Sequence, residues 1–550
     1  MSIRKKRLLQ IGGILIAILL LFGIWFSQNW YKIPGMIKEW EEPVLENQAI
    51  NWKEGPTSRS SDKPNVIVIL VDDLGFNEIS TYGGGMANGQ FKTPHIDQMA
   101  AEGVLCTNGY SAHAVCAPSR ASLLTGRYST RAGFEFTPTA PSMMKFISRI
   151  SNEKLHPPIY HTELEGIGPD VEDMGLPLSE ITIAELLKPQ GYHNIHIGKW
   201  HLGNSIKFNP TNQGFDESLG LHSNSLFLPI DDPNVVNARL PFDPIDKFLW
   251  GNMAHAANWN GGHRFHPDGH TTDYLTNEAV KAIEANKNQP FFMYMAYWAV
   301  HTPLQANKED YDKLSYIEDH AERVQAAMVM TVDRGVGKIR QALKDNGIDE
   351  NTIIVFTSDN GAPGYIGMPE VNSPFRGWKI SLFEGGIHIP YIVSWPGKIP
   401  AGQTYDGRVS NLDIFSTFAA IAGADLPTDR NLDGINIPPY LTDSIEGSPN
   451  RPLFYKDGNY SCVINDNWKL QMDGVQGKKW LFNLANDPTE QQNLVNANNE
   501  KLKELTTLLE THLSEQNTSL WPALLESPIY IDKTLDQEKT EDDEFVYWAN

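Results

Sequence analysis

Cysteine is scarce in this sequence: only Cys106, Cys116 and Cys462 occur among 550 residues. Three cysteines cannot build a disulfide framework, although one bridge is possible, so the fold must rely on its core. Basic residues are also in the minority, 45 against 67 acidic ones, giving a formal net charge of -22. Such a charge would repel a phosphate backbone, which argues against nucleic-acid binding. An anionic ligand would need a locally positive pocket.

The remaining composition is that of an ordinary globular protein, with 41% hydrophobic, 10% aromatic and 20% charged residues. A chain of this length has room for one large domain with a smaller companion. We find no internal repeat. A single large enzyme is therefore the starting expectation.

One long apolar run is present, from Leu8 to Phe26, and it follows the basic residues 4–7. About 20 apolar residues are enough to cross a bilayer. The positive-inside rule keeps the basic residues in the cytoplasm and places everything after Trp30 on the far side. No clear cleavage site precedes Trp30, which favours an uncleaved anchor, with a cleaved signal peptide as the alternative.

Apolar runs and helical periodicity alternate along the chain. Continuous runs predict buried strands, and spacings of three and four predict amphipathic helices. The strands are predicted at 65–71, 291–297, 353–356 and 389–393, and the helices at 95–103, 182–188, 274–286 and 322–345. The alternation predicts an α/β fold, with a large mixed, mostly parallel sheet sandwiched by helices and a smaller C-terminal α+β subdomain.

Changes in composition predict five segments. Residues 1–30 form a cytoplasmic basic segment and transmembrane anchor, 31–62 a linker, 63–450 the catalytic domain, 451–527 the C-terminal subdomain and 528–550 an acidic tail. Within the catalytic domain, 137–178 has few helix or strand signals. Residues 222–270 are rich in histidine and tryptophan, including His222, which suits either sugar stacking or packing.

Polar residues stand where predicted strands end. Asp72 and Asp73 follow the first strand, and Asp359 and Asn360 follow the strand that ends near residue 358. Ligands of open α/β sheets bind at the carboxyl ends of strands, and oxygens from two such ends can meet on a hard divalent cation. Either pair alone also fits a helix cap or a turn.

Candidate cationic residues lie after further predicted strands. Lys199 and His201 occur in Gly-Lys-Trp-His-Leu-Gly, His301 in His-Thr-Pro, and Lys379 precedes Glu384-Gly385-Gly386. A lone lysine is usually exposed and a lone histidine is usually structural. Taken together, they can supply the positive pocket that the acidic total requires.

Cys116 begins the stretch Cys-Ala-Pro-Ser-Arg, which ends at Arg120. The chain then carries, in order from residue 65 to about 390, Asp-Asp-x-Gly, Cys-x-Pro-Ser-Arg, Gly-Lys-Trp-His-x-Gly, His-x-Pro, Ser-Asp-Asn-Gly and Lys-x-x-x-x-Glu-Gly-Gly. This series resembles the type I sulfatases, the arylsulfatase-like, formylglycine-dependent branch of the alkaline phosphatase superfamily. The resemblance implies an alkaline phosphatase-like fold and a sulfuric ester hydrolase.

The resemblance also implies the roles of individual residues. One calcium ion is expected on Asp72, Asp73, Cys116, Asp359 and Asn360, with Cys116 converted to formylglycine by a formylglycine-generating enzyme during synthesis. The expected catalytic set is Cys116, Arg120, Lys199, His201, His301 and Lys379. Within this set, His301 and Lys379 assist the departing oxygen, Arg120 holds the nucleophile, and His201 helps to break a covalent sulfo-enzyme.

The leading expectation is therefore calcium-assisted hydrolysis of a sulfated carbohydrate or aryl sulfate, by a domain anchored to the membrane and lying in a bacterial periplasm. A phosphonate monoester or phosphodiester hydrolase with the same nucleophile is the alternative. A non-catalytic binding protein of the same fold is a third possibility, which the complete set of charged motif positions disfavours.

Overall fold

The computed structural model describes residues 3–151, 153, 155–221, 225–442, 444–449 and 451–550. His222, one of the histidines of the expected substrate region, and Asn450, the predicted end of the catalytic domain, lie outside the described residues. Cys106, Cys116 and Cys462 are all buried and free.

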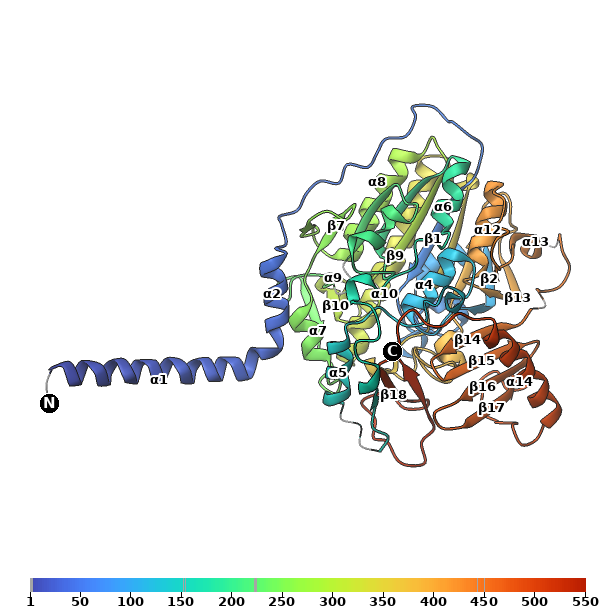
Figure 1. Cartoon of the computed structure of the whole chain (residues 1–550). Helices are drawn as coiled ribbons and strands as arrows, with labels where there is room; N and C mark the ends of the chain where they lie inside the picture. Colours follow the sequence, from blue (N-terminus) through green and yellow to red (C-terminus); the bar gives the residue numbers. More distant parts are fainter. Residues whose placement is uncertain (1–2, 152, 154, 222–224, 443, 450) are drawn as a thin grey trace.

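A ten-stranded sheet forms the centre of the molecule (Figure 1). Its neighbours are parallel around β1, which pairs with β11 and β9, whereas β12 runs antiparallel to both β11 and β2. The mixed, mostly parallel sheet predicted from the sequence is confirmed. In spatial order the strands are β13 (Gln403–Ser410), β2 (Val104–Tyr110), β12 (Tyr391–Ser394), β11 (Thr352–Ser358), β1 (Asn65–Val71), β9 (Phe291–Tyr297), β4 (His193–Lys199), β5 (Glu217–Leu221), β7 (Ala257–Trp259) and β8 (Arg264–Phe265).

Helices cover both faces of this sheet, and β1 shows why. Successive side chains of a strand point to opposite faces, so an unbroken apolar strand needs a core on each side. Ile67, Ile69 and Val71 join one core, and Val66, Val68 and Leu70 join the other. The first core includes residues of α3 (Pro94–Ala101), α8 (Thr271–Asn286) and α10 (His320–Asp345), and the second includes α4 (Cys116–Thr125), α6 (Ile183–Leu187) and α12 (Asp413–Ala422).

The predicted helices form with small shifts at their ends. The start of α6 is fixed by a capping box, in which Thr182 accepts from the Glu185 amide and Glu185 accepts from Thr182. Among the helices that were not predicted, α5 (Pro141–Ile150) lies in the region expected to have few helix signals. It begins with Pro141 and buries Met144, a pattern too short to stand out among the surrounding loops.

The C-terminal part forms an antiparallel sheet of β14 (Leu453–Asp457), β15 (Tyr460–Asn465), β16 (Trp468–Asp473) and β17 (Lys478–Asn483), covered by α14 (Asn499–Ser514). The predicted α+β subdomain is thus confirmed. The segment 528–550, predicted as an acidic tail, takes part in a sheet, because β18 (Leu525–Tyr530) pairs with both β19 (Phe545–Ala549) and β3 (Ile159–Tyr160). Phe545 and Val546 are buried there, so the chain end is part of the fold.

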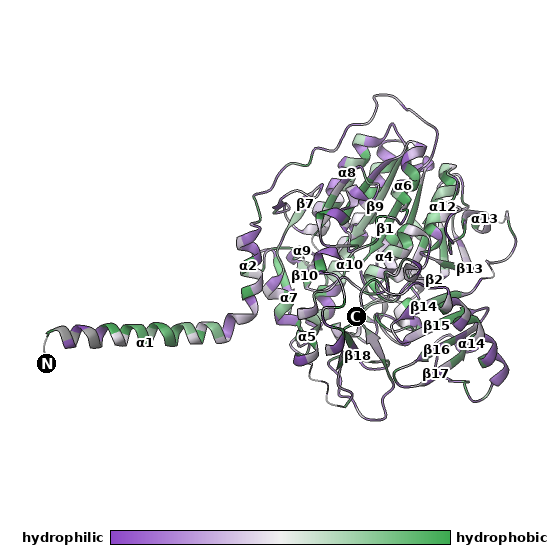
Figure 2. Cartoon of the chain, in the orientation of Figure 1, coloured by the Kyte–Doolittle hydropathy of each residue, from purple (hydrophilic) through white to green (hydrophobic). Residues whose placement is uncertain are grey.

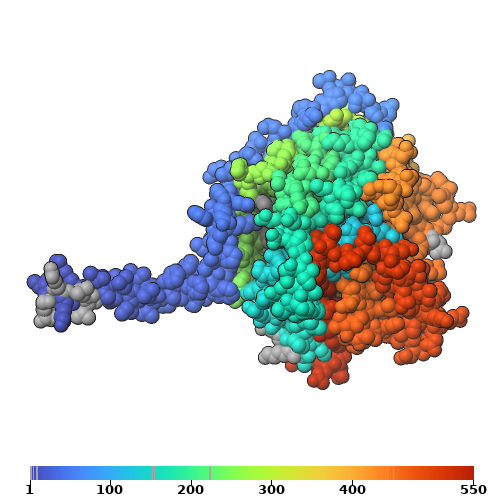
Figure 3. Space-filling view, viewed as in Figure 1, coloured from blue at the N-terminus to red at the C-terminus, as the bar shows by residue number. Residues whose placement is uncertain are grey.

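Short elements complete the side of the domain near the N-terminal helices. They are the antiparallel pair β6 (Val235–Ala238) and β10 (Leu304–Asn307), and the helices α7 (Asp246–Asn252) and α9 (Lys308–Lys313). Two further short helices, α11 (Glu384–Ile387) and α13 (Pro438–Leu441), lie elsewhere in the chain. The N-terminal apolar run forms α1 (Ile3–Asn29), which stands clear of the domain and is apolar over most of its length (Figures 2 and 3). The expected linker is not all extended, because it contains α2 (Ile33–Glu41), docked on α7.

Candidate active site

Cys116 is the first residue of α4, and its side chain lies among carboxylates. Its Sγ is 3.3 Å from Asp72 Oδ1 and 3.5 Å from Asp73 Oδ1. Burial and the nearby Asp359 carboxylate raise the pKa of the Cys116 thiol well above its ordinary value. An unmodified thiol at this position is therefore protonated, and the protonated form is a poor nucleophile.

The pair Asp72 and Asp73 and the pair Asp359 and Asn360 converge because β1 and β11 are adjacent. Val71 pairs with Ser358 in the parallel register, so the residues that follow the two strands meet at the same edge of the sheet. The Asp73 amide donates to Asp359 Oδ1 at 3.1 Å, and Asn360 Nδ2 donates to Asp73 Oδ1 at 2.7 Å. All four side chains are buried, as the predicted metal site requires.

This group fits a hard cation. Among the described residues, ligand atoms of Asp72, Asp73, Cys116 and His301 lie within 4.8 Å of one another. Asn360 Oδ1 is buried and has no hydrogen-bond partner, and an orphaned amide oxygen beside carboxylates is a natural calcium ligand. Asp359 adjoins the group through Asp73, while its Oδ2 pairs with Arg120.

Arg120 and Lys199 hold the carboxylates from the other side. Arg120 is fully buried and reaches Asp359 Oδ2 at 2.7 Å and Asp72 Oδ1 at 3.4 Å. It also donates to the Lys199 carbonyl, which ties α4 to the end of β4. Lys199 Nζ lies 2.5 Å from Asp72 Oδ2.

Lys379 and His301 occupy the Asp73 side of the group. Lys379 Nζ is 2.7 Å from Asp73 Oδ1, and His301 Nε2 is 3.5 Å from Asp73 Oδ2. His301 Nδ1 lies 2.7 Å from the Thr302 carbonyl, which can only accept, so Nδ1 carries a proton and Nε2 is the nitrogen facing the site. The structure thus brings His301 closer to the predicted metal residues than the sequence indicated.

His201 follows Lys199 in a strained turn, with φ of 63°. Its Nδ1 is buried without a hydrogen-bond partner. Burial and the neighbouring Lys199 cation hold the pKa of His201 well below its ordinary value, so the ring is neutral. A neutral imidazole with a free nitrogen can accept a proton.

The charges of the site set its protonation. Burial alone would raise the pKa of Asp72, but Lys199 and Arg120 lower it to about 2. Burial alone would lower the pKa of Lys379, but Asp73 raises it. The Asp72 carboxylate and the Lys379 ammonium are therefore charged at neutral pH, and the acidic chain does gather basic side chains at this edge.

Sequence reasoning missed two residues that adjoin this group. The Tyr365 hydroxyl donates to Asp73 Oδ2 at 3.3 Å, from the loop after β11. Trp298 lies under Lys199, with its ring centroid 4.7 Å from Nζ. Trp298 could have been found because it directly follows a predicted strand, whereas nothing near Tyr365 in the sequence distinguishes it from an ordinary loop tyrosine.

Three of the described histidines of 222–270, namely His255, His266 and His270, do not join this site. His255 and His266 stack on each other, with ring centroids 6.1 Å apart, and His270 stacks on Phe227. Within the described part of the chain, they form no group suited to a metal ion. Packing therefore accounts for these three histidines.

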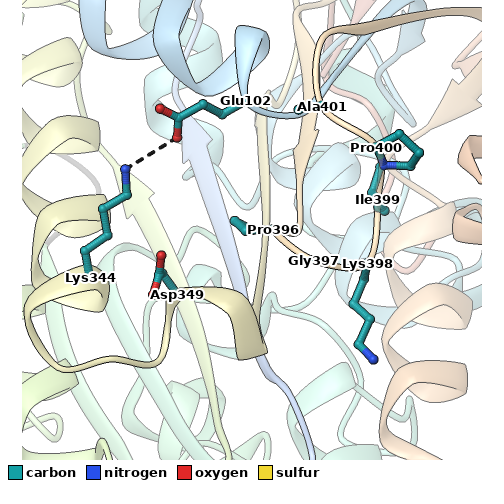
Figure 4. A pocket seen from close by; sticks show the side chains of 9 residues that line it. All are labelled: Glu102, Lys344, Asp349, Pro396, Gly397, Lys398, Ile399, Pro400 and Ala401. Atoms are coloured by element: carbon teal, nitrogen blue, oxygen red, sulfur yellow. Dashed lines mark hydrogen bonds and ion pairs between the residues drawn. The ribbon is translucent and has the colours of Figure 1, made fainter.

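A surface hollow of about 630 Å³ lies away from these residues (Figure 4). It is lined by Glu102, Lys344, Asp349 and the loop 396–401. Asp349 precedes β11, whereas Asp359 follows it. The hollow therefore lies at the amino-terminal end of β11, opposite the end at which the candidate site lies. An ion pair of 3.5 Å between Lys344 and Glu102 crosses it, and its lining lacks the convergent buried charges of the strand ends.

Comparison with known proteins places these features in a family. Residues 64–424 match the family described as Sulfatase, and residues 377–519 match N-sulphoglucosamine sulphohydrolase, C-terminal. N-acetylgalactosamine-6-sulfatase of Homo sapiens is 34% identical over 416 residues, covering 73% of this chain and 70% of that protein. Steryl-sulfatase of Rattus norvegicus is 29% identical over 491 residues, covering 78% of this chain and 79% of that protein.

Comparison with solved structures gives a similar fold. The crystal structure of Ps i-CgsB in complex with k-i-k-neocarrahexaose superposes with a TM-score of 0.69 and 31% identity. The match covers 84% of this chain and 94% of that chain.

Proposed function

This chain belongs to the sulfatase family and is a sulfuric ester hydrolase, and from that premise we propose that it removes sulfate from a saccharide, using Cys116 as the site of the nucleophile. The saccharide is favoured because one relative is named for N-acetylgalactosamine-6-sulfate chemistry and a solved relative holds an oligosaccharide. The observation that carries the proposal is the position of Cys116. It begins a helix at a buried strand edge where Asp72 and Asp73 meet Lys199 and Lys379.

Cys116 acts in this proposal after oxidation to formylglycine by a separate enzyme during synthesis. The hydrate of that aldehyde supplies one hydroxyl to attack sulfur and a second to expel sulfate from a covalent sulfo-enzyme. The buried, protonated thiol supports this step, because the thiol itself is a poor nucleophile here.

Calcium fits the oxygens of Asp72, Asp73, Asp359 and Asn360, where it would polarise the sulfate oxygens and favour the ionised nucleophile. Arg120 bridges Asp72 and Asp359 and so keeps these oxygens in place. Because the Arg120 guanidinium is buried and held in place before the substrate arrives, it needs no reorganisation during the reaction.

The remaining residues bind the sulfuryl group and move protons. Lys199 and Lys379 offset the negative charge of the sulfuryl oxygens. Lys379 Nζ, which is charged, gives a proton to the departing sugar oxygen, and His301 assists that oxygen from the same side of Asp73. His201, neutral with a free Nδ1, takes the proton from the second hydroxyl.

The location of the reaction follows from α1, a helix long and apolar enough to cross a membrane. We propose that α1 is an uncleaved anchor and that the catalytic domain lies outside the cytoplasm, in a bacterial periplasm. The basic residues 4–7 would remain on the cytoplasmic side.

The test combines mass spectrometry with turnover. The Cys116 peptide of protein made in its own host should carry the aldehyde, and turnover of a sulfated sugar should exceed that of the matched phosphate ester. Cys116→Ala should abolish turnover, whereas Cys106→Ala, which changes another buried cysteine, should retain it. An unmodified thiol in active protein would contradict the nucleophile, and faster phosphate turnover would favour the phosphodiesterase alternative.

A further inference from the structure

The helix α2 runs crosswise to α1 and lies along the side of the domain (Figure 1). The two helices are joined by a short 3₁₀ turn, Trp30–Lys32. If α1 crosses the bilayer, as proposed above, a helix that follows it directly and runs crosswise must lie near the plane of the membrane surface.

One side of α2 is held by the domain. Arg264 donates to the Glu42 carbonyl, and Asn252 Nδ2 donates to the Tyr31 carbonyl at 3.1 Å. A Cβ on Gly35 would lie 2.5 Å from the Gly251 carbonyl oxygen, so only glycine allows this close contact between α2 and α7. These contacts fix the rotation of α2 about its own axis.

The other side of α2 is apolar and uncovered. Met36, Ile37 and Trp40 are 52%, 51% and 83% exposed, which is unusual for residues of this type. Their spacing of one and four residues puts them on a common face, and that face points away from Gly35, which contacts the domain. Helix polarity of this kind, with a tryptophan on the apolar face, is typical of helices at a membrane interface.

Aromatic residues continue this surface at the end of α1. The Trp30 ring lies 5.1 Å from Phe248 of α7 and 6.3 Å from Phe146 of α5, measured between centroids. Tryptophan is enriched at the level of lipid headgroups, so Trp30 marks the depth at which α1 leaves the membrane. It also ties that level to α5 and α7.

We propose that α2 lies on the surface of the bilayer that α1 crosses, with Met36, Ile37 and Trp40 in the interfacial layer. The domain is then held in one orientation, with α5 and α7 toward the membrane. These two helices come from 137–178 and 222–270. This inference rests on the anchoring proposed above.

The test measures the depth of single positions in the full chain, reconstituted in vesicles of phosphatidylcholine and phosphatidylglycerol that contain nitroxide-labelled lipid. A fluorescent thiol probe is placed by Ile37→Cys, by Ile18→Cys within α1, and by Thr428→Cys on a distant exposed loop. The three natural cysteines are buried and label poorly. We expect quenching at 18 and 37 and none at 428.

The outcomes separate the two proposals. Quenching at 18 with none at 37 overturns the surface position of α2 but leaves the anchor, whereas no quenching at 18 removes the anchor and this inference with it. A disulfide-linked dimer through position 37 in place of quenching would assign the face to a second copy of the chain. Met36→Glu with Trp40→Glu should at least halve the quenching at 37, and full quenching in that variant would also contradict the proposal.

Discussion

Asn360 has a buried amide oxygen beside the carboxylates of the site. Its Nδ2 donates to Asp73 and to the Gly361 carbonyl, while its buried Oδ1 has no partner. A ligand that binds only the folded state stabilises it by about 2.7 kcal/mol at one hundred times its dissociation constant. Calcium should therefore raise the unfolding temperature of the protein, and Asn360→Ala should raise the calcium concentration needed at least tenfold.

Asn411→Ala is the matched control for this prediction. Asn411 is also buried near the end of β11, but both of its polar atoms are bonded, to the Ser358 carbonyl and the Thr357 hydroxyl. It should lower the unfolding temperature without changing the calcium dependence. The prediction fails if chelation leaves the unfolding temperature of the natural protein unchanged, or if the two variants shift the calcium titration equally.

Tyr365 offers a second prediction at the same scale. Its hydroxyl contacts Asp73 Oδ2, and its ring lies 6.0 Å from Lys379 Nζ. Tyr365→Phe removes only the hydroxyl, and a hydrogen bond to a charged group contributes about 1.5 to 3 kcal/mol. We expect kcat/KM to fall about tenfold or more, and the free energy of unfolding to fall by no more than the contribution of that one bond. Tyr316→Phe, at a tyrosine that is 45% exposed, should alter neither; equal rates in both variants would exclude a role for the Tyr365 hydroxyl.

At the scale of elements, a buried ion cluster joins β16 to α11. Lys469 of β16 is fully buried, 2.8 Å from Glu384 Oε1 and 2.9 Å from Glu490 Oε1. Glu384 begins α11, five residues after Lys379, and its other oxygen accepts from the Tyr110 hydroxyl. The C-terminal sheet therefore holds the segment that carries Lys379, the lysine proposed above to act in catalysis.

Lys469→Met tests this link. Removing one partner of a buried cluster leaves uncompensated charge, which typically costs about 3 to 5 kcal/mol. We expect a loss of that size in the free energy of unfolding, measured by denaturant titration. Lys479→Met, on the exposed part of the neighbouring strand β17, should change it by less than about 0.5 kcal/mol. Similar values for the two variants would mean that the cluster contributes little.

At the scale of the whole molecule, the formal charge of -22 and the cationic site are reconciled by burial. The site cations Lys199, Lys379 and Arg120 are paired with carboxylates inside the domain, so the strand ends gather basic side chains that the acidic total does not indicate. An anionic substrate would meet these basic side chains only at the site itself, because the overall field of the acidic chain repels it.

Buried neutral histidines predict how the whole molecule responds to acid. Burial lowers the pKa of His512 to about 3 and that of His113 to about 4, against about 6.5 in an unfolded chain. Because the folded pKa values are depressed, the stabilisation is present above pH 6.5 and is lost as the pH falls toward 4. The unfolding temperature should therefore decline through this window.

His512→Phe should flatten part of that decline. The His512 ring stacks on Phe454 at a centroid distance of 3.9 Å and an interplanar angle of 3°, which a phenyl ring can reproduce. The difference in unfolding free energy between pH 7 and pH 4.5 should shrink by on the order of 2 kcal/mol. His263→Phe, at an exposed histidine, is the control. The same pH profile in the natural protein and in His512→Phe would contradict the assignment.

The sequence by itself was enough to predict the fold class, the strands β1 and β9 and the family. The apolar runs 65–71 and 291–297 record burial on both faces directly, since each residue must be apolar whichever face it occupies. The motifs at Cys116 and at the strand ends indicate the family through their order along the chain. These signals are local, so they can be recognised without knowing which other segments of the chain they contact.

Only the tertiary structure decided which segments meet. The Asp73 amide and Asp359 are 286 residues apart, and the pairing of β1 with β11 alone makes them neighbours. No sequence signal marked Tyr365, Lys469 or the uncovered face of α2. The environment of each depends on contacts with residues far away in the sequence. Loop closure brings such residues together at a cost that only the complete core repays, so no single stretch of the chain could predict them.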